Sequence, residues 1–365
     1  MLKNKRTYIV AALIITAIAV VIGMNIYYAY TSNYVCDIGG KKVTKKEFLL
    51  LLGEAKREIL DAANEAQQGG LDEQAAAAFW TTKIGGKDAS EVAKERALQS
   101  AKDLKVQMIM AERNKIELTQ TEVKTFKENI DEMIAKSGGE QSFLSGLMQY
   151  GINDINTFAN VLLQYKVIEK FIQSELPKYS VAEQDMRSYY DQNSDKFTPN
   201  KNEESVWARH ILIKTVDANG NLLPEPVIEE ARKKVEDILN RIKAGEDFAS
   251  LATQFTEDPG SKNNGGQYLF SRGQMVEPFE QAAFSLQPGE VSGIVETEFG
   301  YHIIKCEEKI SAAQPISFDG AQKCYAYNLD ENYMKNLTYK RNLEEWKKEY
   351  DVNINHRVYD LIKVQ

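Results

Sequence analysis

The sequence is poor in cysteine and in histidine, and its acidic residues outnumber its basic ones. Its three cysteines, Cys36, Cys306 and Cys324, contain no C-x-x-C pair, so neither a structural zinc site nor a disulfide framework is expected. The 53 acidic residues outnumber the 45 basic ones and give a net charge of -8, which argues against a nucleic-acid partner. No metal or other cofactor is expected. The 43% hydrophobic share argues against wholesale disorder, and the 365 residues favour more than one domain.

A long hydrophobic run lies at the N-terminus, from about Tyr8 to Tyr30, after Lys3, Lys5 and Arg6. A secretory signal core is about 7–15 residues long, whereas a bilayer core needs about 20, which this run supplies. The preceding basic residues place the tail in the cytoplasm and the remaining ~330 residues outside. We predict that residues 1–34 are a cytoplasmic tail and a single-pass anchor in the cell membrane, with an extracytoplasmic bulk. A cleaved signal peptide is the alternative.

Residues 35–202 are predicted to be mainly helical. A short strand at 35–43 comes first. Capping boxes of the form S/T-x-x-E at Thr44, Thr119 and Ser180 then predict the starts of helices. Glycine pairs at 85–86 and 138–139 separate helical segments. The apolar stripes of these helices are interpreted as core, and an exposed peptide-binding groove is the alternative.

The pattern changes near residue 200. A strand is predicted at Val206–Val216, with Trp207, Ile211 and Ile213 on one face and His210 on the other. Helices at about 227–243, 247–255 and 277–285 follow, and a last strand is predicted at Tyr301–Cys306. This order predicts an α+β module in which helices cover a small antiparallel sheet. A charged helix at 340–350 and a short strand at 351–355 are expected near the C-terminus.

Two of the three histidines, His210 and His302, lie in the two predicted strands of this module. Either histidine alone would more often be structural than catalytic. If the two strands are adjacent and central, however, both rings meet on one face of the sheet.

The module resembles the parvulin family of peptidyl-prolyl isomerases over residues 203–310. The resemblance follows an ordered series of motifs, Arg209-His210-Ile211-Leu212, Gly265-Gly266, Arg272-Gly273-Gln274-Met275, Pro278-Phe279-Glu280 and Phe299-Gly300-Tyr301-His302. The flanks resemble membrane-anchored extracytoplasmic foldases of the PrsA and SurA type. This resemblance implies a helical chaperone domain with a linker helix at 35–202, a parvulin domain at 203–310, and a segment at 311–365 that packs back on the chaperone domain.

The resemblance also implies a set of site residues. The catalytic positions fall on His210, His302 and Asp258, and the substrate-binding positions on Met275, Phe279, Gln274 and Thr297. From spacing alone, Met275 and Phe279 are equally well explained as ordinary core, and Gln274 and Thr297 as residues that satisfy a turn. The turn at 265–270 is one residue shorter than usual in the family, which affects one contact near Tyr268 or Leu269.

The implied activity is rotation about X-Pro bonds, whose barrier of about 20 kcal/mol comes from amide resonance. No substrate bond breaks, so the reaction needs no nucleophile or metal. The expected partners are unfolded or partly folded exported polypeptides, and a homodimer is a further expectation. The loop at 217–226 contains two acids and no arginine, so selectivity for phosphorylated substrates is disfavoured, and Lys214 is interpreted as a solvated charge. A non-enzymatic holdase with a silent parvulin module is the alternative function, and a transmembrane sensor is a weaker one.

Overall fold

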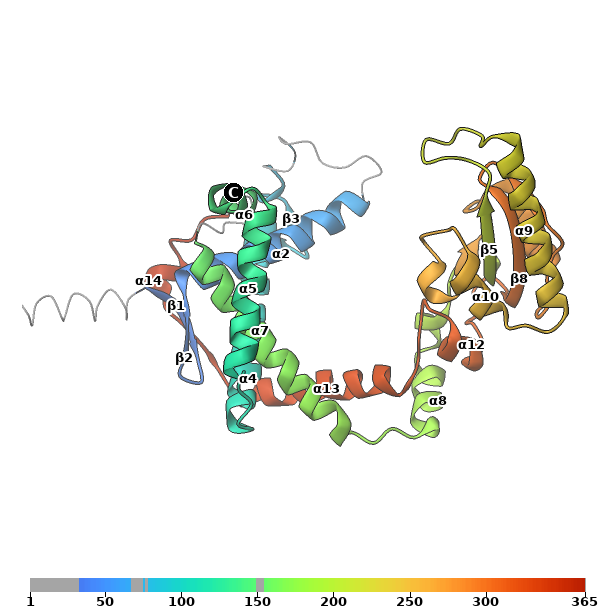
Figure 1. The fold of residues 1–365 in the computed structure, drawn as a ribbon. Coiled ribbons are helices and arrows are strands. Elements are labelled where there is room, and N and C mark those ends of the chain that lie inside the picture. The colour runs from blue at the N-terminus through green and yellow to red at the C-terminus, as the bar shows by residue number, and fades with distance from the viewer. Residues whose placement is uncertain (1–32, 67–74, 76–77, 149–153, 365) are drawn as a thin grey trace, which may run out of the picture. The chain divides into compact units, whose positions relative to one another are not determined.

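The computed structural model describes residues 33–66, 75, 78–148 and 154–364. The predicted membrane segment therefore lies outside the described residues. Among the residues that are described, no helix is long and apolar enough to cross a membrane. The fold is α+β, mostly helical with small antiparallel sheets, as predicted. The chain divides into two compact units, residues 1–178 with 338–365 (the first unit) and residues 179–337 (the second unit; Figure 1).

The first unit combines a small sheet with a set of helices. The antiparallel sheet has the order β2-β1-β9, and its strands are β1 (Tyr34–Ile38), β2 (Lys41–Thr44) and β9 (Val352–Ile354). A separate two-stranded ladder consists of β3 (Lys83–Ile84) and β4 (Lys87–Asp88). The helices are α2 (Lys45–Ala66), α4 (Ala89–Arg113), α5 (Gln120–Lys136), α6 (Glu140–Met148), α7 (Ile155–Glu175) with the 3-10 turn η1 (Leu176–Lys178), and α14 (His356–Tyr359).

The predicted helix starts have different outcomes. At Thr119 the box is complete, because the Glu122 backbone N–H donates to the Thr119 hydroxyl over 3.2 Å and the Glu122 carboxylate accepts from the Thr119 N–H over 2.6 Å. The predicted box at Ser180 is wrong. Helix α8 (Glu183–Gln192) begins after Ala182, whose N–H donates to the Asp185 carboxylate over 2.9 Å. The reason is that an acid at the third helical position can cap a start without a hydroxyl partner.

Helix α2 is capped by Thr44, whose hydroxyl accepts from the Glu47 N–H over 3.2 Å. The Glu47 carboxylate, however, turns inward and pairs with Lys105 of α4 over 2.7 Å. Both side chains are buried, and the Gln164 side chain of α7 bonds to each of them. This polar contact therefore connects three helices inside the first unit.

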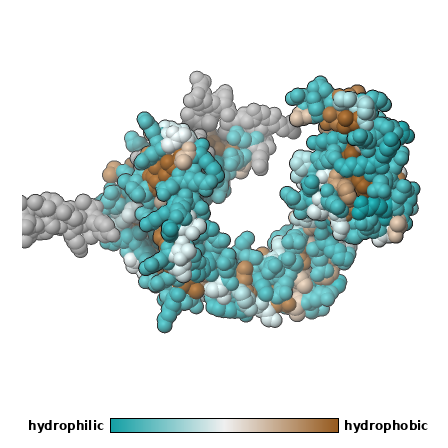
Figure 2. Space-filling model, viewed as in Figure 1, coloured by the Kyte–Doolittle hydropathy of each residue, from teal (hydrophilic) through white to brown (hydrophobic). Residues whose placement is uncertain are grey.

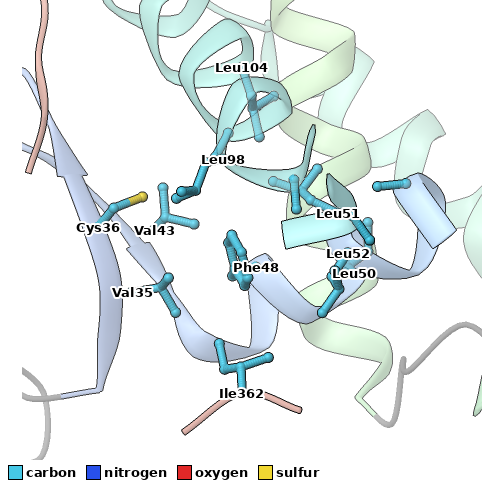
Figure 3. Packing of buried hydrophobic residues seen from close by; sticks show 14 of the residues in the cluster. Val35, Cys36, Val43, Phe48, Leu50, Leu51, Leu52, Leu98, Leu104 and Ile362 are labelled. Carbon is cyan, nitrogen blue, oxygen red and sulfur yellow. The ribbon is translucent and has the colours of Figure 1, made fainter. Parts of the chain in front are cut away.

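Hydrophobic side chains from both ends of the chain form the core of the first unit. Figure 3 shows Phe48 of α2 among Val35 and Val43 of the sheet, Leu104 of α4, and Ile362 from the C-terminal segment. The backbone also joins the C-terminal segment to this unit, because strand β9 pairs with β1 in antiparallel register.

The second unit contains a four-stranded antiparallel sheet of order β6-β5-β8-β7. Its strands are β5 (Ser205–Lys214), β6 (Gln267–Ser271), β7 (Val295–Thr297) and β8 (Gly300–Ile310), and its main helices are α9 (Glu225–Lys243), α10 (Phe248–Phe255) with the turn η3 (Lys262–Asn264), and α11 (Glu277–Ser285). Helices α9 and α10 cover one face, where Ile211, Ile213 and Ile303 pack with Val235 and Leu251. Helix α11 covers the other face.

A further cluster joins the flanking segments to the sheet. It surrounds Phe197 and Trp207 and includes side chains from η2 (Ser194–Phe197), α12 (Phe318–Lys323) and the first part of α13 (Glu331–Lys348). Trp207 enters this separate cluster where a bulge interrupts the β5–β8 register. The second unit is thus longer than the predicted module at both ends, and residues 311–365 divide between the two units.

Figure 2 shows a mostly hydrophilic surface with small hydrophobic patches.

Candidate active site

The two histidines meet because their strands are neighbours in the centre of the sheet. In the β5–β8 register Leu212 lies opposite His302, and His210 lies opposite Ile304. Side chains two apart on a strand share a face, so both imidazoles project towards α11. Their Nδ1 atoms are 3.3 Å apart, and the rings stack with centroids 5.5 Å apart. Each histidine is only 4% exposed.

Asp258 and Thr297 bond to the outer ends of the histidine pair. The Asp258 Oδ2 atom lies 2.9 Å from His210 Nε2, and Thr297 Oγ1 lies 2.8 Å from His302 Nε2. The backbone N–H of Phe299 donates to Thr297 Oγ1 over 3.1 Å. Four of the five predicted polar residues therefore form one continuous chain of contacts through both rings.

The charge of Asp258 determines where the protons lie in this chain. Burial raises the pKa of the Asp258 carboxyl, but hydrogen bonds from His210, Ser261, Gly260 and Tyr268 outweigh it and hold the pKa well below its usual range. An ionised carboxylate only accepts, so His210 must donate from Nε2. With the ring proton of His210 on Nε2, its Nδ1 atom accepts from His302 Nδ1–H, and His302 Nε2 accepts from the Thr297 hydroxyl.

His302 is held neutral by its surroundings. Burial lowers its pKa to about 3, and the neighbouring His210 lowers it as well, while Asp258 opposes both effects. An imidazole with this pKa carries no charge at neutral pH. His302 therefore offers a neutral hydrogen-bonding group in a buried position.

An apolar cavity of about 500 Å³ opens beside the pair. Phe279 of α11 packs edge-on against both imidazoles, with ring centroids 5.4 Å from His210 and 5.3 Å from His302. Besides these three residues the cavity is lined by Leu212, Lys214, Asp258, Pro259, Tyr268, Gln274, Met275, Val276 and Phe299. Met275 and Phe279 also belong to the core cluster under α11, so the core and wall interpretations both apply to them.

Gln274 and Thr297, the two polar residues that a turn could also explain, have different contacts. Gln274 lines the cavity, and its side-chain oxygen also accepts from the Ser271 N–H over 2.7 Å, which satisfies the turn. Thr297 bonds to His302 without lining the cavity. No group of three or more His, Cys, Asp or Glu side chains in the described parts of the chain could hold a metal ion.

Several lining residues were not predicted from the sequence. Leu212 and Lys214 alternate with His210 along β5, so the period of two could have identified them. Lys214, expected to be a solvated charge, is half-buried at the edge of the cavity. Tyr268 had no such signal, because its position depends on the short glycine turn.

That turn is held directly against His210. The Gly266 carbonyl accepts from the His210 N–H over 2.8 Å, and Gly266 has a φ of +80°. A Cβ atom at this position would lie 2.3 Å from the His210 carbonyl oxygen, so only glycine fits. The short turn therefore preserves the strand that carries His210 and places Tyr268 at the cavity.

Comparison with known proteins shows the family of this chain. The family model of the PPIC-type PPIASE domain matches residues 195–310. The foldase protein PrsA of Caldanaerobacter subterraneus subsp. tengcongensis is 28% identical over 81% of this chain and 80% of its own length. PrsA of Halalkalibacterium halodurans is 30% identical over 71% of this chain and 72% of its own. A crystal structure of PrsA from Bacillus subtilis aligns over 75% of this chain and 86% of its own, with 23% identity and a TM-score of 0.33. The chain therefore belongs to the PrsA foldase family and carries a parvulin-type peptidyl-prolyl cis-trans isomerase domain.

Proposed function

We propose that isomerisation takes place in the cavity on the α11 face, with the substrate proline ring against Met275 and Phe279 and its imide beside His210 and His302. The observation that carries the proposal is the meeting of a hydrogen-bonded histidine pair and an apolar wall in one cavity of about 500 Å³. Twisting an X-Pro bond removes amide resonance, so a catalyst must favour the twisted imide over the planar one.

The residues of the cavity suit that task. An apolar wall excludes water from the proline ring, and fixed hydrogen-bonding groups nearby can stabilise the changed charge on the twisted imide. Asp258 does not act as a nucleophile in this proposal, because no covalent step is needed and its oxygens already accept hydrogen bonds. It acts on the substrate only through His210.

A protease-coupled assay with a short prolyl peptide tests the site. His210→Ala and Met275→Ala should each lower kcat/KM about tenfold or more, whereas Gln281→Ala, on the exposed side of α11, should leave it unchanged. Wild-type turnover by both site variants would overturn the assignment. Absence of turnover in the wild-type protein, together with suppressed aggregation of a client, would favour the holdase alternative.

The first unit is proposed to bind unfolded polypeptides as the chaperone domain. A groove of about 370 Å³ on this unit is lined mainly by apolar side chains, among them Met108, Leu118, Leu163 and Val167. Such a groove can accept apolar segments of an unfolded chain. Leu163→Gln should weaken the suppression of client aggregation, whereas the exposed Lys166→Gln should not. Equal suppression by both variants would contradict this role.

We further propose that residues 8–30 anchor the protein in the cell membrane, with the remainder outside the cytoplasm, where exported polypeptides fold. Uncatalysed proline isomerisation takes tens to hundreds of seconds, which makes assistance useful after export. Fractionation and protease treatment of intact cells test this location. Recovery in the soluble cytoplasmic fraction would overturn it. The proposed homodimer is tested separately, by sedimentation over a range of concentrations.

A further inference from the structure

We propose that Ser261 and Tyr268 are positioning residues of the isomerase site, whose hydroxyl groups fix the Asp258 carboxylate and thereby select one tautomer for both histidines. The inference rests on the proposed function of this cavity. It assigns roles to two side chains that neither the strand pattern nor the predicted site included.

Both hydroxyls converge on one carboxylate oxygen. Ser261 Oγ donates to Asp258 Oδ2 over 2.5 Å, and the Tyr268 hydroxyl donates to the same atom over 2.9 Å. His210 Nε2 is the third group on this oxygen, at 2.9 Å, while Oδ1 accepts from the Gly260 N–H over 3.1 Å. An oxygen surrounded by three donors has no room for a proton of its own, so the carboxylate stays ionised.

The two hydroxyls reach Asp258 from different elements, which fixes the carboxylate in more than one direction. Ser261 is fully buried in the turn after Asp258. Tyr268 comes from β6, where it lies opposite Ala208 of β5, and its ring centroid is 5.3 Å from that of His210. Burial and the adjacent Asp258 raise the pKa of Tyr268 to about 12, so its hydroxyl remains a donor.

The backbone leaves space for this contact. A Cβ atom at Gly260 would lie 2.5 Å from the Tyr268 hydroxyl oxygen, so a larger residue there would displace the tyrosine. The side chain of Asp258 is 16% exposed, whereas that of His210 is 5% exposed. Without the two hydroxyls, the carboxylate would be held only by His210 and the Gly260 N–H and could turn towards water.

The other end of the histidine chain cannot select a tautomer. Thr297 has a hydroxyl group that can donate to His302 Nε2 or accept from it. His210 Nε2 lies 2.9 Å from both Asp258 Oδ2 and Ser261 Oγ. Ser261 gives its proton to the ionised Asp258, so neither oxygen can donate to His210, and His210 must donate from Nε2. This in turn determines that His302 donates from Nδ1. Fixing Asp258 therefore fixes which nitrogen of each imidazole donates and which accepts.

Three variants of the full chain test the proposal, namely Tyr268→Phe, Ser261→Ala and the double variant. Tyr268→Phe retains the aromatic wall and removes only the hydroxyl. Long-range ¹H–¹⁵N spectra should show one tautomer for His210 and His302 in the wild type, and nitrogen shifts averaged between two tautomers in the double variant. Each single variant should lower kcat about five- to tenfold, with peptide affinity unchanged within about twofold.

Tyr301→Phe is the matched control, because it removes a tyrosine hydroxyl from β8 on the opposite face of the sheet. It should change neither the tautomers nor kcat. A single, unaltered tautomer in the double variant would overturn the proposal, as would a loss that appears only in peptide affinity. An inactive wild-type protein that still shows the tautomer change would instead refute the proposed isomerase function and leave the positioning role intact. Backbone amide spectra establish that each variant is folded.

Discussion

The depressed pKa of His302 predicts a specific loss of stability in mild acid. The folded protein holds this pKa at about 3, chiefly through burial, whereas an imidazole in an unfolded chain titrates near about 6.5. Between these two values the unfolded chain binds a proton that the folded chain does not. Protons therefore favour unfolding, and this contribution to stability, complete above about pH 6.5, is lost as the pH falls.

The magnitude follows from the same two pKa values. Each pH unit within the window costs about 1.4 kcal/mol, so lowering the pH from 7.5 to 5 should remove about 2 kcal/mol from the free energy of unfolding of the second unit. In His302→Gln the side chain cannot bind a proton, so this part of the pH dependence should disappear. Because slopes are compared, a difference in absolute stability between the two proteins does not affect the test.

Urea unfolding at several pH values measures the effect. Trp207 is buried in the second unit, and Trp80 and Trp346 pack in the first, so Trp80→Phe/Trp346→Phe makes fluorescence report on the second unit alone. Measurements stay above pH 4.5, where carboxylates contribute least. His356→Gln, which alters an exposed histidine in the first unit, should leave the slope unchanged. Equal slopes for the wild type and His302→Gln would refute the reasoning.

Three other changes have expected outcomes. Gly266→Ala should destabilise the second unit by more than about 2 kcal/mol in the same urea titration, because the new methyl group would lie 2.3 Å from a carbonyl oxygen at a φ of +80°. Lys105→Met should destabilise the first unit by about 3–5 kcal/mol in thermal unfolding followed by circular dichroism, since it leaves the buried Glu47 unpaired. Lys214→Ala should lower kcat/KM for a Glu-Pro peptide relative to an Ala-Pro peptide by no more than about threefold, because one half-exposed ammonium contributes little.

Matched variants accompany these changes. Gly245→Ala alters a glycine with a φ of +94° and no heavy atom within 4 Å of the new methyl group, so its cost should be smaller. Glu47→Leu combined with Lys105→Met removes both buried charges and should recover most of the loss. Lys233→Ala, on the exposed side of α9, should not alter the peptide ratio. A loss of stability in Gly266→Ala equal to that in Gly245→Ala would contradict the argument from the carbonyl contact. An unchanged melting temperature in Lys105→Met would contradict the argument from the buried ion pair. A peptide ratio shifted more than about tenfold by Lys214→Ala would contradict the small contribution expected of its ammonium group.

The long periodic elements of the second unit could be predicted from the sequence, and the short ones could not. Strand β5 and helices α9 to α11 follow their expected ranges closely because their hydrophobic periods extend over many residues. Strand β7 covers only Val295–Thr297, and β6 begins immediately after a glycine pair, so neither shows a usable alternation. Short motifs are ambiguous for the same reason. Thr119 and Ser180 both begin an S/T-x-x-E pattern, but Thr119 caps a helix and Ser180 does not.

The histidine pair could be predicted for a similar reason, whereas the residues that fix it could not. A period of two places His210 and His302 on definite faces of their strands. Because the two strands are neighbours in the sheet, the rings then lie close together. The Tyr268 contact with Asp258 instead depends on the path of the chain through Gly265 and Gly266, both of which have positive φ. Side-chain contacts across such a turn follow from backbone torsions, and residue spacing alone does not encode them.

The electrostatics of the site follow from a single requirement. A cavity that holds a proline ring must exclude water, and the same exclusion makes a charged imidazole too costly, as the pKa of His302 shows. A chain of hydrogen-bonded imidazoles has no preferred direction of donation unless one end carries a charge. The site places that charge on Asp258, which is more exposed than His210, and Ser261, Tyr268 and Gly260 supply donors that offset the cost of partial burial. Replacing the carboxylate by the amide in Asp258→Asn removes the charge but retains the shape, so it should abolish the single tautomer while leaving the fold intact; a single tautomer preserved in that variant would show that packing, and not charge, sets the direction.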